Sequence, residues 1–202
     1  AVYALLGLIA TQSFVYVYYQ TSLRLQRWSP LISSLCAIAT FLLVARAFSH
    51  MPARPVLVMA LTLLSMGLFI YLFRKLPDAT IAKAVKLGPR VLLLRAIFSA
   101  GLIVFITAVA KLVGERWAGL LSGFPLTLFP FILIIHFTYR PAHVHTIIKN
   151  FPKGMGALVL YAISVYLLYP RLGIYVGTLA AFAAASLYLM VILLRSAPAA
   201  AS

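Results

Sequence analysis

The stretch GLLSGFPLTLFP, residues 119–130, combines two prolines with two hydroxyl side chains inside an apolar run. Pro125 and Pro130 each lack an amide hydrogen and crowd the carbonyl four residues earlier, so each should free one backbone carbonyl from helical hydrogen bonding. Lipid offers no donor to such a carbonyl, which must find a protein partner or line a cavity. Ser122 and Thr127 are nearby side-chain donors.

Two structures are compatible with these prolines. In one, the helix is only kinked, and packing satisfies the carbonyls of Leu121 and Leu126, because membrane helices tolerate glycine and proline. In the other, the chain departs from regular helix between Leu121 and Pro130 and borders a polar cavity. We predict the departure from helix, with Arg95 on or near the cavity wall. Arg95 lies deepest of the basic residues in an apolar stretch and is the best candidate for pairing with an anion.

Ser33, Cys36 and Thr40 are spaced i, i+3 and i+7, so they share one face of a helix. A polar stripe of this kind either packs against a neighbouring helix, which is the more common outcome, or lines a path through the bundle. Cys36 is the single cysteine of the chain, which excludes an internal disulfide.

His136, His143 and His145 lie close together in the sequence, but neither acid of the chain, Asp78 or Glu115, lies near them. Metal sites usually complete a histidine set with cysteine or carboxylate ligands. We therefore expect no metal and interpret the histidines as solvated side chains at a membrane boundary. The scarcity of acids also disfavours a carrier of cations.

No catalytic set is recognisable in the sequence. It contains no Ser-His-Asp order, no paired carboxylates, no phosphate-binding P-loop, no glycine-rich dinucleotide fingerprint and no CxxC pair. We therefore assign no catalytic residue and expect no cofactor.

The composition indicates the solvent in which these residues must be positioned. Of 202 residues, 64% are hydrophobic and 9% are charged. Soluble domains are about 45–50% apolar, with about a quarter of their residues charged. The sequence therefore predicts an all-α, polytopic integral membrane helix bundle with almost no soluble part. The basic residues are scattered between apolar runs, so we expect no nucleic-acid partner.

A helix needs about 20 apolar residues to cross the hydrocarbon core of a bilayer. About seven runs meet this requirement and form a single transmembrane domain over residues 1–195, followed by a short tail at 196–202. Six spans and a re-entrant segment are the alternative. The expected spans are 1–20, 28–47, 55–73, 91–110, 117–139, 154–169 and 173–194.

The 17 basic residues are distributed unevenly between the two sides of this predicted bundle. Twelve lie in the C-terminus or near the connections that follow the first, third and fifth spans, and five lie on the other side. The positive-inside rule then places the C-terminus in the cytoplasm and the N-terminus outside. We expect the plasma membrane of a bacterium or an archaeon, with the lipid bilayer and its anionic head groups as partners.

Two further patterns concern the membrane boundary. The 74–90 connection has the signals of a short interfacial helix, with Asp78 as its N-cap and Gly88-Pro89 as its stop. An ordinary connector between two spans fits these residues equally well. Aromatic residues at span ends, among them Tyr18 and Tyr19, are typical of interfacial belts, and we assign them no chemistry.

A loose internal repeat indicates how the spans are arranged. The sequence RWSPLIS at residues 27–33 recurs as RWAGLLS at 116–122, with arginine, tryptophan, leucine and serine in the same register. If the two are homologous, residues 1–75 and 91–170 form inverted repeats, because each contains three spans. The helix at 173–194 is then an addition. Inverted repeats with a site at their interface are typical of transporters.

These features favour a small membrane transporter or channel for an anionic or lipid-linked solute, with a path between two inverted halves. The alternative is a non-catalytic subunit of a membrane complex, and a homodimer is compatible with both. A lipid-modifying enzyme is a third, weaker interpretation. The predicted path residues are Arg95, Ser122, Pro125, Thr127, Pro130, Ser33, Cys36 and Thr40.

Overall fold

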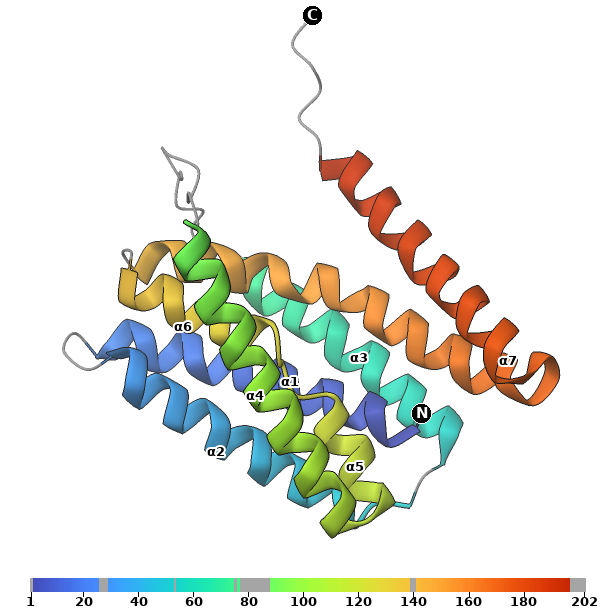
Figure 1. The fold of residues 1–202 in the computed structure, drawn as a ribbon. Coiled ribbons are helices and arrows are strands. Elements are labelled where there is room, and N and C mark those ends of the chain that lie inside the picture. Colours follow the sequence, from blue (N-terminus) through green and yellow to red (C-terminus); the bar gives the residue numbers. More distant parts are fainter. Residues whose placement is uncertain are drawn as a thin grey trace, which may run out of the picture.

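The computed structural model describes residues 2–25, 29–52, 54–74, 76, 88–138 and 141–196, and every regular element in these residues is an α-helix (Figure 1). The predicted all-α fold is therefore confirmed. The helices are α1 (Val2–Arg24), α2 (Ser29–Ser49), α3 (Pro55–Arg74), α4 (Pro89–Val113), α5 (Glu115–Ser122), α6 (Leu128–Thr138) and α7 (Pro141–Ser196).

Five of these helices, namely α1, α2, α3, α4 and α7, are long and apolar enough to cross a membrane. Their outward faces carry large apolar side chains that stay exposed; Leu43 and Leu64 are each 70% exposed, and Val104 is 69% exposed. Such surfaces are unfavourable in water but match the acyl chains of a bilayer. The chain is therefore a helical integral membrane protein.

The first four predicted spans are confirmed as α1 to α4, with ends that differ by a few residues. The fifth predicted span, 117–139, is divided into α5 and α6. The sixth and seventh are joined in α7, which bends at Gly173, where φ is 71°. α7 begins at Pro141, earlier than the predicted start at 154. Proline is accepted at this position because an amide in the first turn of a helix has no intrahelical partner.

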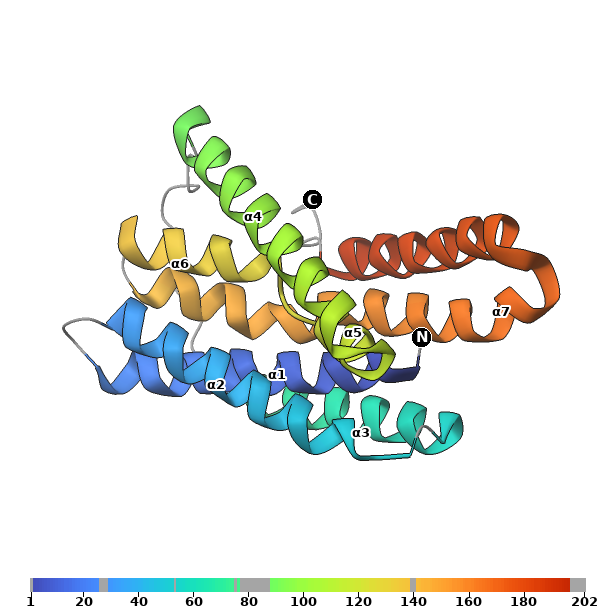
Figure 2. The ribbon, with the colours of Figure 1, turned by 60° about the horizontal axis from the view of Figure 1, so that its bottom comes forward.

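α1 lies at the centre of the bundle, where it packs against α2, α3, α5 and α7 (Figure 2). Leu5, Leu6, Phe14 and Val15 of this helix are fully buried. A helix at the edge of a protein buries one face only, whereas α1 is enclosed on several sides. Polar side chains on α1 must therefore find partners within the protein.

The helix ends are grouped as the predicted alternation of spans requires. Figures 1 and 2 show the C-terminal ends of α1, α3 and α6 toward one end of the bundle, and those of α2, α4 and the first segment of α7 toward the other. The connections that follow α1, α3 and α6 therefore begin at the same end of the bundle.

The two predicted repeat units pack differently. In the first, α1 contacts both α2 and α3; in the second, α4 contacts α5 and α6, but none of its described residues contacts α7. Arg27 and Trp28 of the repeat motif, residues 77–87 of the predicted interfacial helix, and the tail after Ser196 lie outside the described residues.

Candidate functional site

The chain leaves regular helix between α5 and α6, over residues 123–127, as the prolines predicted. We call this segment the break. Pro125 accounts for its first end, because it cannot donate to the carbonyl of Leu121. That carbonyl accepts a hydrogen bond from the amide of Phe124 instead, at 3.0 Å. α5 therefore ends without an unsatisfied carbonyl at this position.

Pro130 accounts for the second end of the break. The amide of Phe129 donates to the carbonyl of Pro125 at 2.8 Å, which forms one helical turn. The next such bond would run to the carbonyl of Leu126, and Pro130 has no amide hydrogen to donate. Regular helix therefore begins only at Leu128.

Thr11 of α1 connects the break to the centre of the bundle. Its Oγ1 is within hydrogen-bond distance of the carbonyl of Gly123, in the break, and 3.1 Å from the carbonyl of Gly7 on its own helix. Ser122, the donor expected from the sequence, binds the carbonyl of Gly119 at 2.7 Å instead. A donor on a distant helix is thus within reach of the carbonyl of Gly123, and nothing in the local sequence identifies this donor.

α1 and the break approach each other so closely that only glycine fits at the contact. A Cβ atom at Gly123 would lie 2.7 Å from the Cα of Gly7, and one at Gly119 would lie 2.6 Å from the Cβ of Tyr3. The small residues Gly119 and Gly123 therefore allow close packing of helices within the bundle.

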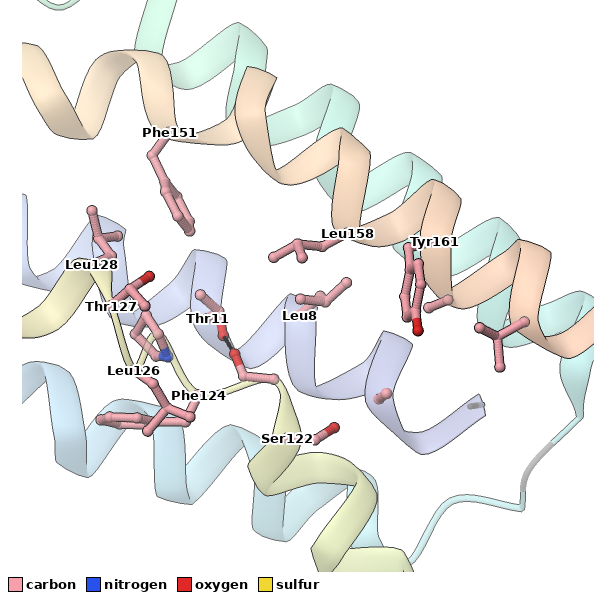
Figure 3. Close-up of a pocket in the computed structure, with 15 residues that line it drawn as sticks. Leu8, Thr11, Ser122, Phe124, Leu126, Thr127, Leu128, Phe151, Leu158 and Tyr161 are labelled. Carbon is pink, nitrogen blue, oxygen red and sulfur yellow. Dashed lines mark hydrogen bonds between the residues drawn. The ribbon is translucent and has the colours of Figure 1, made fainter. Parts of the chain in front are cut away.

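A cavity of about 420 Å³ lies between α1, the break and α7 (Figure 3). Its volume is in the usual range of ligand pockets. Among the described residues that line it, four have a polar side chain and none is charged. The polar ones are Thr11, Ser122, Thr127 and Tyr161; apolar ones include Leu8, Phe124, Phe151, Leu158 and Val165. The predicted cavity exists, but its walls are mainly apolar rather than polar.

The cavity is open toward the side of the bundle. Leu158, near the middle of the first segment of α7, is 53% exposed, and Ser122 and Thr127 are exposed as well. In the described part of the chain α5 makes no contact with α7, so the two leave the cavity uncovered between them. The middle of a membrane-spanning helix lies at the depth of the hydrocarbon core, so this opening lies at the side of the bundle rather than at either end.

The predicted path residues divide into two groups. Ser122, Pro125 and Thr127 line the cavity. Arg95 is not among the lining residues, and its guanidinium lies 4.5 Å from the centroid of the Phe131 ring. Pro130 is buried in the first turn of α6, outside the lining.

The polar stripe of α2 also lies away from the cavity. Ser33 is fully buried, and the hydroxyl of Thr40 donates to the carbonyl of Cys36 at 2.8 Å. None of the three residues lines the cavity, and Cys36 and Thr40 are half-buried.

Aromatic side chains lie next to the cavity, further along α1, and Phe124 belongs to both. The ring of Phe124, in the break, lies 5.8 Å from Phe14, 5.1 Å from Phe41 and 6.0 Å from Phe129, measured between ring centroids. Most of these contacts are edge to face, the favourable geometry for aromatic pairs. We call these four residues the aromatic cluster.

Beyond the aromatic cluster, two histidines bind hydroxyl groups of α1. The hydroxyl of Tyr18 lies 2.9 Å from Nδ1 of His136, and Oγ of Ser22 lies 2.8 Å from Nε2 of His145. His136 is 6% exposed and His145 is 9% exposed, so the prediction of solvated histidines is wrong for both. Tyr18, interpreted as part of an interfacial belt, is fully buried.

The spacing of Tyr18 and Ser22 is the signal that sequence reasoning missed. The two residues are four apart, so they share a face of α1 and lie one turn from each other. Buried polar side chains in a membrane helix require partners, and the histidines of α6 and α7 supply them. Among the described residues, no three histidine, cysteine or acidic side chains are grouped so that they could hold a metal ion.

Replacing Tyr18 with phenylalanine should destabilise the fold by about 1–3 kcal/mol, because Nδ1 of the buried His136 then loses its partner. Thermal unfolding in detergent measures the effect. Tyr16→Phe is the matched control, because Tyr16 contacts Phe69 and Phe73 through its ring. Equal stability of the two variants would show that the Tyr18 hydrogen bond contributes nothing.

Comparisons with known proteins give no assignment: no family model matches the chain, and no characterised protein or solved structure matches it significantly.

Proposed function

We propose that this protein is a small membrane carrier for an amphipathic, lipid-like solute, such as a lipid-linked phosphate. The observation that carries the proposal is the non-helical break beside an apolar cavity that opens to the side of the bundle. Broken helices beside a cavity are the usual substrate sites of secondary transporters. A mainly apolar cavity of this size suits the first part of a hydrocarbon chain better than a hydrophilic solute.

The polar end of the solute would bind at the break. Thr127 directly precedes α6, which begins at Leu128 and whose N-terminal end carries the positive end of the helix dipole. The hydroxyl of Thr127 adds a side-chain donor or acceptor. No charged side chain lines the cavity in the described residues, so a phosphate would be held by hydroxyl groups and by the dipole at the start of α6.

Movement of the solute would require the aromatic cluster to open. Phe124 is the part of this cluster that belongs to the break, and non-helical backbone can change conformation without breaking a helix. In this proposal, rotation of Phe124 away from Phe14 and Phe41 joins the cavity to the Tyr18–His136 and Ser22–His145 pairs. The polar groups of these pairs would then receive the solute's polar end.

The inverted repeat of residues 1–75 and 91–170 stays a prediction. It would give the path a two-fold pseudosymmetry. Within the described residues, α1 contacts both other helices of its unit, whereas α4 does not contact α7. The carrier proposal therefore does not use the repeat. The proposed path runs between α1, the break and α7.

We also propose that the end of the bundle at which α1, α3 and α6 terminate faces the cytoplasm, because most basic residues lie there. Single cysteines at Arg195 and Arg171, in a Cys36→Ser background, test this orientation. A membrane-impermeant maleimide added to intact cells should label Arg171→Cys and leave Arg195→Cys unlabelled. The opposite pattern would reverse the orientation.

The carrier proposal is tested with the purified chain alone in liposomes. The probes are a fluorescent polyprenyl phosphate and a fluorescent phosphatidylglycerol, and dithionite quenching reports how fast each leaves the inner leaflet. We expect the chain to accelerate translocation of at least one probe over empty liposomes. Acceleration only in the presence of co-purified proteins, or none with either probe, would favour the non-catalytic subunit.

A further inference from the structure

A second cavity, of about 220 Å³, lies between the C-terminal end of α3 and the first segment of α7. Its lining residues are Ile70, Phe73, Arg74, Lys149 and Lys153. None of them lines the cavity at the break. We call this the basic cavity, because three of its five lining residues carry a positive charge.

The basic cavity has an apolar wall and a cationic rim. Phe73 is 1% exposed and is held in place by the rings of Tyr16 and Tyr19, at centroid distances of 6.1 and 6.5 Å. Arg74 is the last residue of α3. Lys149 and Lys153 are four residues apart on α7, so they lie on the same face in successive turns.

The charges of the rim are concentrated at one end of the bundle. Glu115, the acid that the structure describes, begins α5, and Figure 1 shows this helix toward the opposite end from the C-terminal end of α3. Arg74 ends a membrane-spanning helix, so it lies at the depth of lipid head groups. The rim is thus positioned to meet negative charge at the membrane surface.

We propose that the basic cavity is a binding site for an anionic phospholipid. Its phosphate would contact Arg74, Lys149 and Lys153, and the adjoining part of its glycerol and acyl chains would lie against Ile70 and Phe73. Arginine binds a phosphate through two parallel N–H groups, and the lysines add point charges. A free phosphate ion would use the rim alone, so the apolar wall favours the lipid. This site does not depend on the carrier proposal.

Mixed micelles of a non-ionic detergent test the site, with phosphatidylglycerol, phosphatidylcholine or inorganic phosphate added to the full chain. We expect phosphatidylglycerol to raise the unfolding temperature and to stay bound in native mass spectra, whereas the other two do neither. The variant Arg74→Gln/Lys149→Gln/Lys153→Gln should bind phosphatidylglycerol roughly a hundredfold more weakly, from about fivefold for each cation lost. Arg74→Lys/Lys149→Arg/Lys153→Arg, which keeps every charge, should retain most of the affinity.

The matched control is Lys111→Gln/Arg116→Gln/Arg171→Gln, which removes the same charge from exposed residues elsewhere on the chain. This variant should bind phosphatidylglycerol like the wild type. If both triple variants bind phosphatidylglycerol equally more weakly, the lipid is attracted by the overall positive charge of the protein, and the proposed site is overturned. Stabilisation by inorganic phosphate equal to that by phosphatidylglycerol would overturn the lipid as its ligand.

Discussion

The variant Gly123→Ala should lose about 2–3 kcal/mol of folding free energy, the cost of overpacking a site that cannot relax. The added methyl group would meet the backbone of α1, with the Cα of Gly7 at 2.7 Å. Backbone atoms at a helix contact cannot move aside as a flexible side chain can, so α1 and the break must separate. The hydrogen bond from Thr11 to the carbonyl of Gly123 would be strained by the same shift.

Thermal or denaturant unfolding in detergent measures this loss, and Gly7→Ala should reproduce it from the other side of the contact. Gly101→Ala in α4 is the control, because an added Cβ there meets no atom within 4 Å. Alanine in a helix interior is favoured over glycine by about 0.5–1 kcal/mol, so this control should be as stable as the wild type or slightly more. A stable Gly123→Ala protein would show that the close approach of α1 and the break is not maintained.

Filling the cavity at the break should stop transport while the fold remains intact. Ala162 lies on the α7 side of the cavity and is 8% exposed, so Ala162→Trp places an indole ring in the space proposed for the solute. We expect translocation of the fluorescent lipid probe to fall by at least about tenfold, which corresponds to binding weaker by about 1.4 kcal/mol or to a transport barrier higher by about the same amount. The cavity offers room for the ring, so unfolding should change less than in Gly123→Ala.

Two further variants separate blockage from misfolding. Leu158→Trp enlarges a half-exposed side chain at the cavity opening and should slow translocation less than Ala162→Trp. Ala183→Trp adds the same ring to an exposed position in the second segment of α7, where it faces lipid. This control should transport like the wild type. If Ala162→Trp transports normally and unfolds normally, the solute does not pass through this cavity.

The sequence predicted the helices well because the length of an apolar run is set by the thickness of the bilayer, independently of the partners of each residue. The break was also predictable, because the missing amide hydrogens of Pro125 and Pro130 are local properties of the chain. The early start of α7 was not. The basic residues between 140 and 153 resembled a connection, although a helix continues past the membrane boundary without needing apolar residues.

The environment of each polar residue could not be predicted, because it depends on which helices meet. The hydroxyls of Ser122 and Thr127 suggested a polar cavity, but Phe151 and Leu158 of α7 make its opposite wall apolar. The partner of Tyr18 lies 118 residues away, at His136, and no local pattern connects the two. Arg95 lay deep in an apolar run, yet in the fold its guanidinium lies over the Phe131 ring.

Photolabelling with a diazirine-bearing polyprenyl phosphate tests most directly whether the cavity at the break binds a lipid-like solute. The probe is irradiated with the wild-type chain in liposomes, and the modified residues are identified by mass spectrometry. We expect adducts within residues 122–128 and 151–165, which are removed by excess unlabelled polyprenyl phosphate and are absent in Ala162→Trp. Adducts spread over the outward faces of α4 and the second segment of α7, unaffected by competitor, would contradict this expectation.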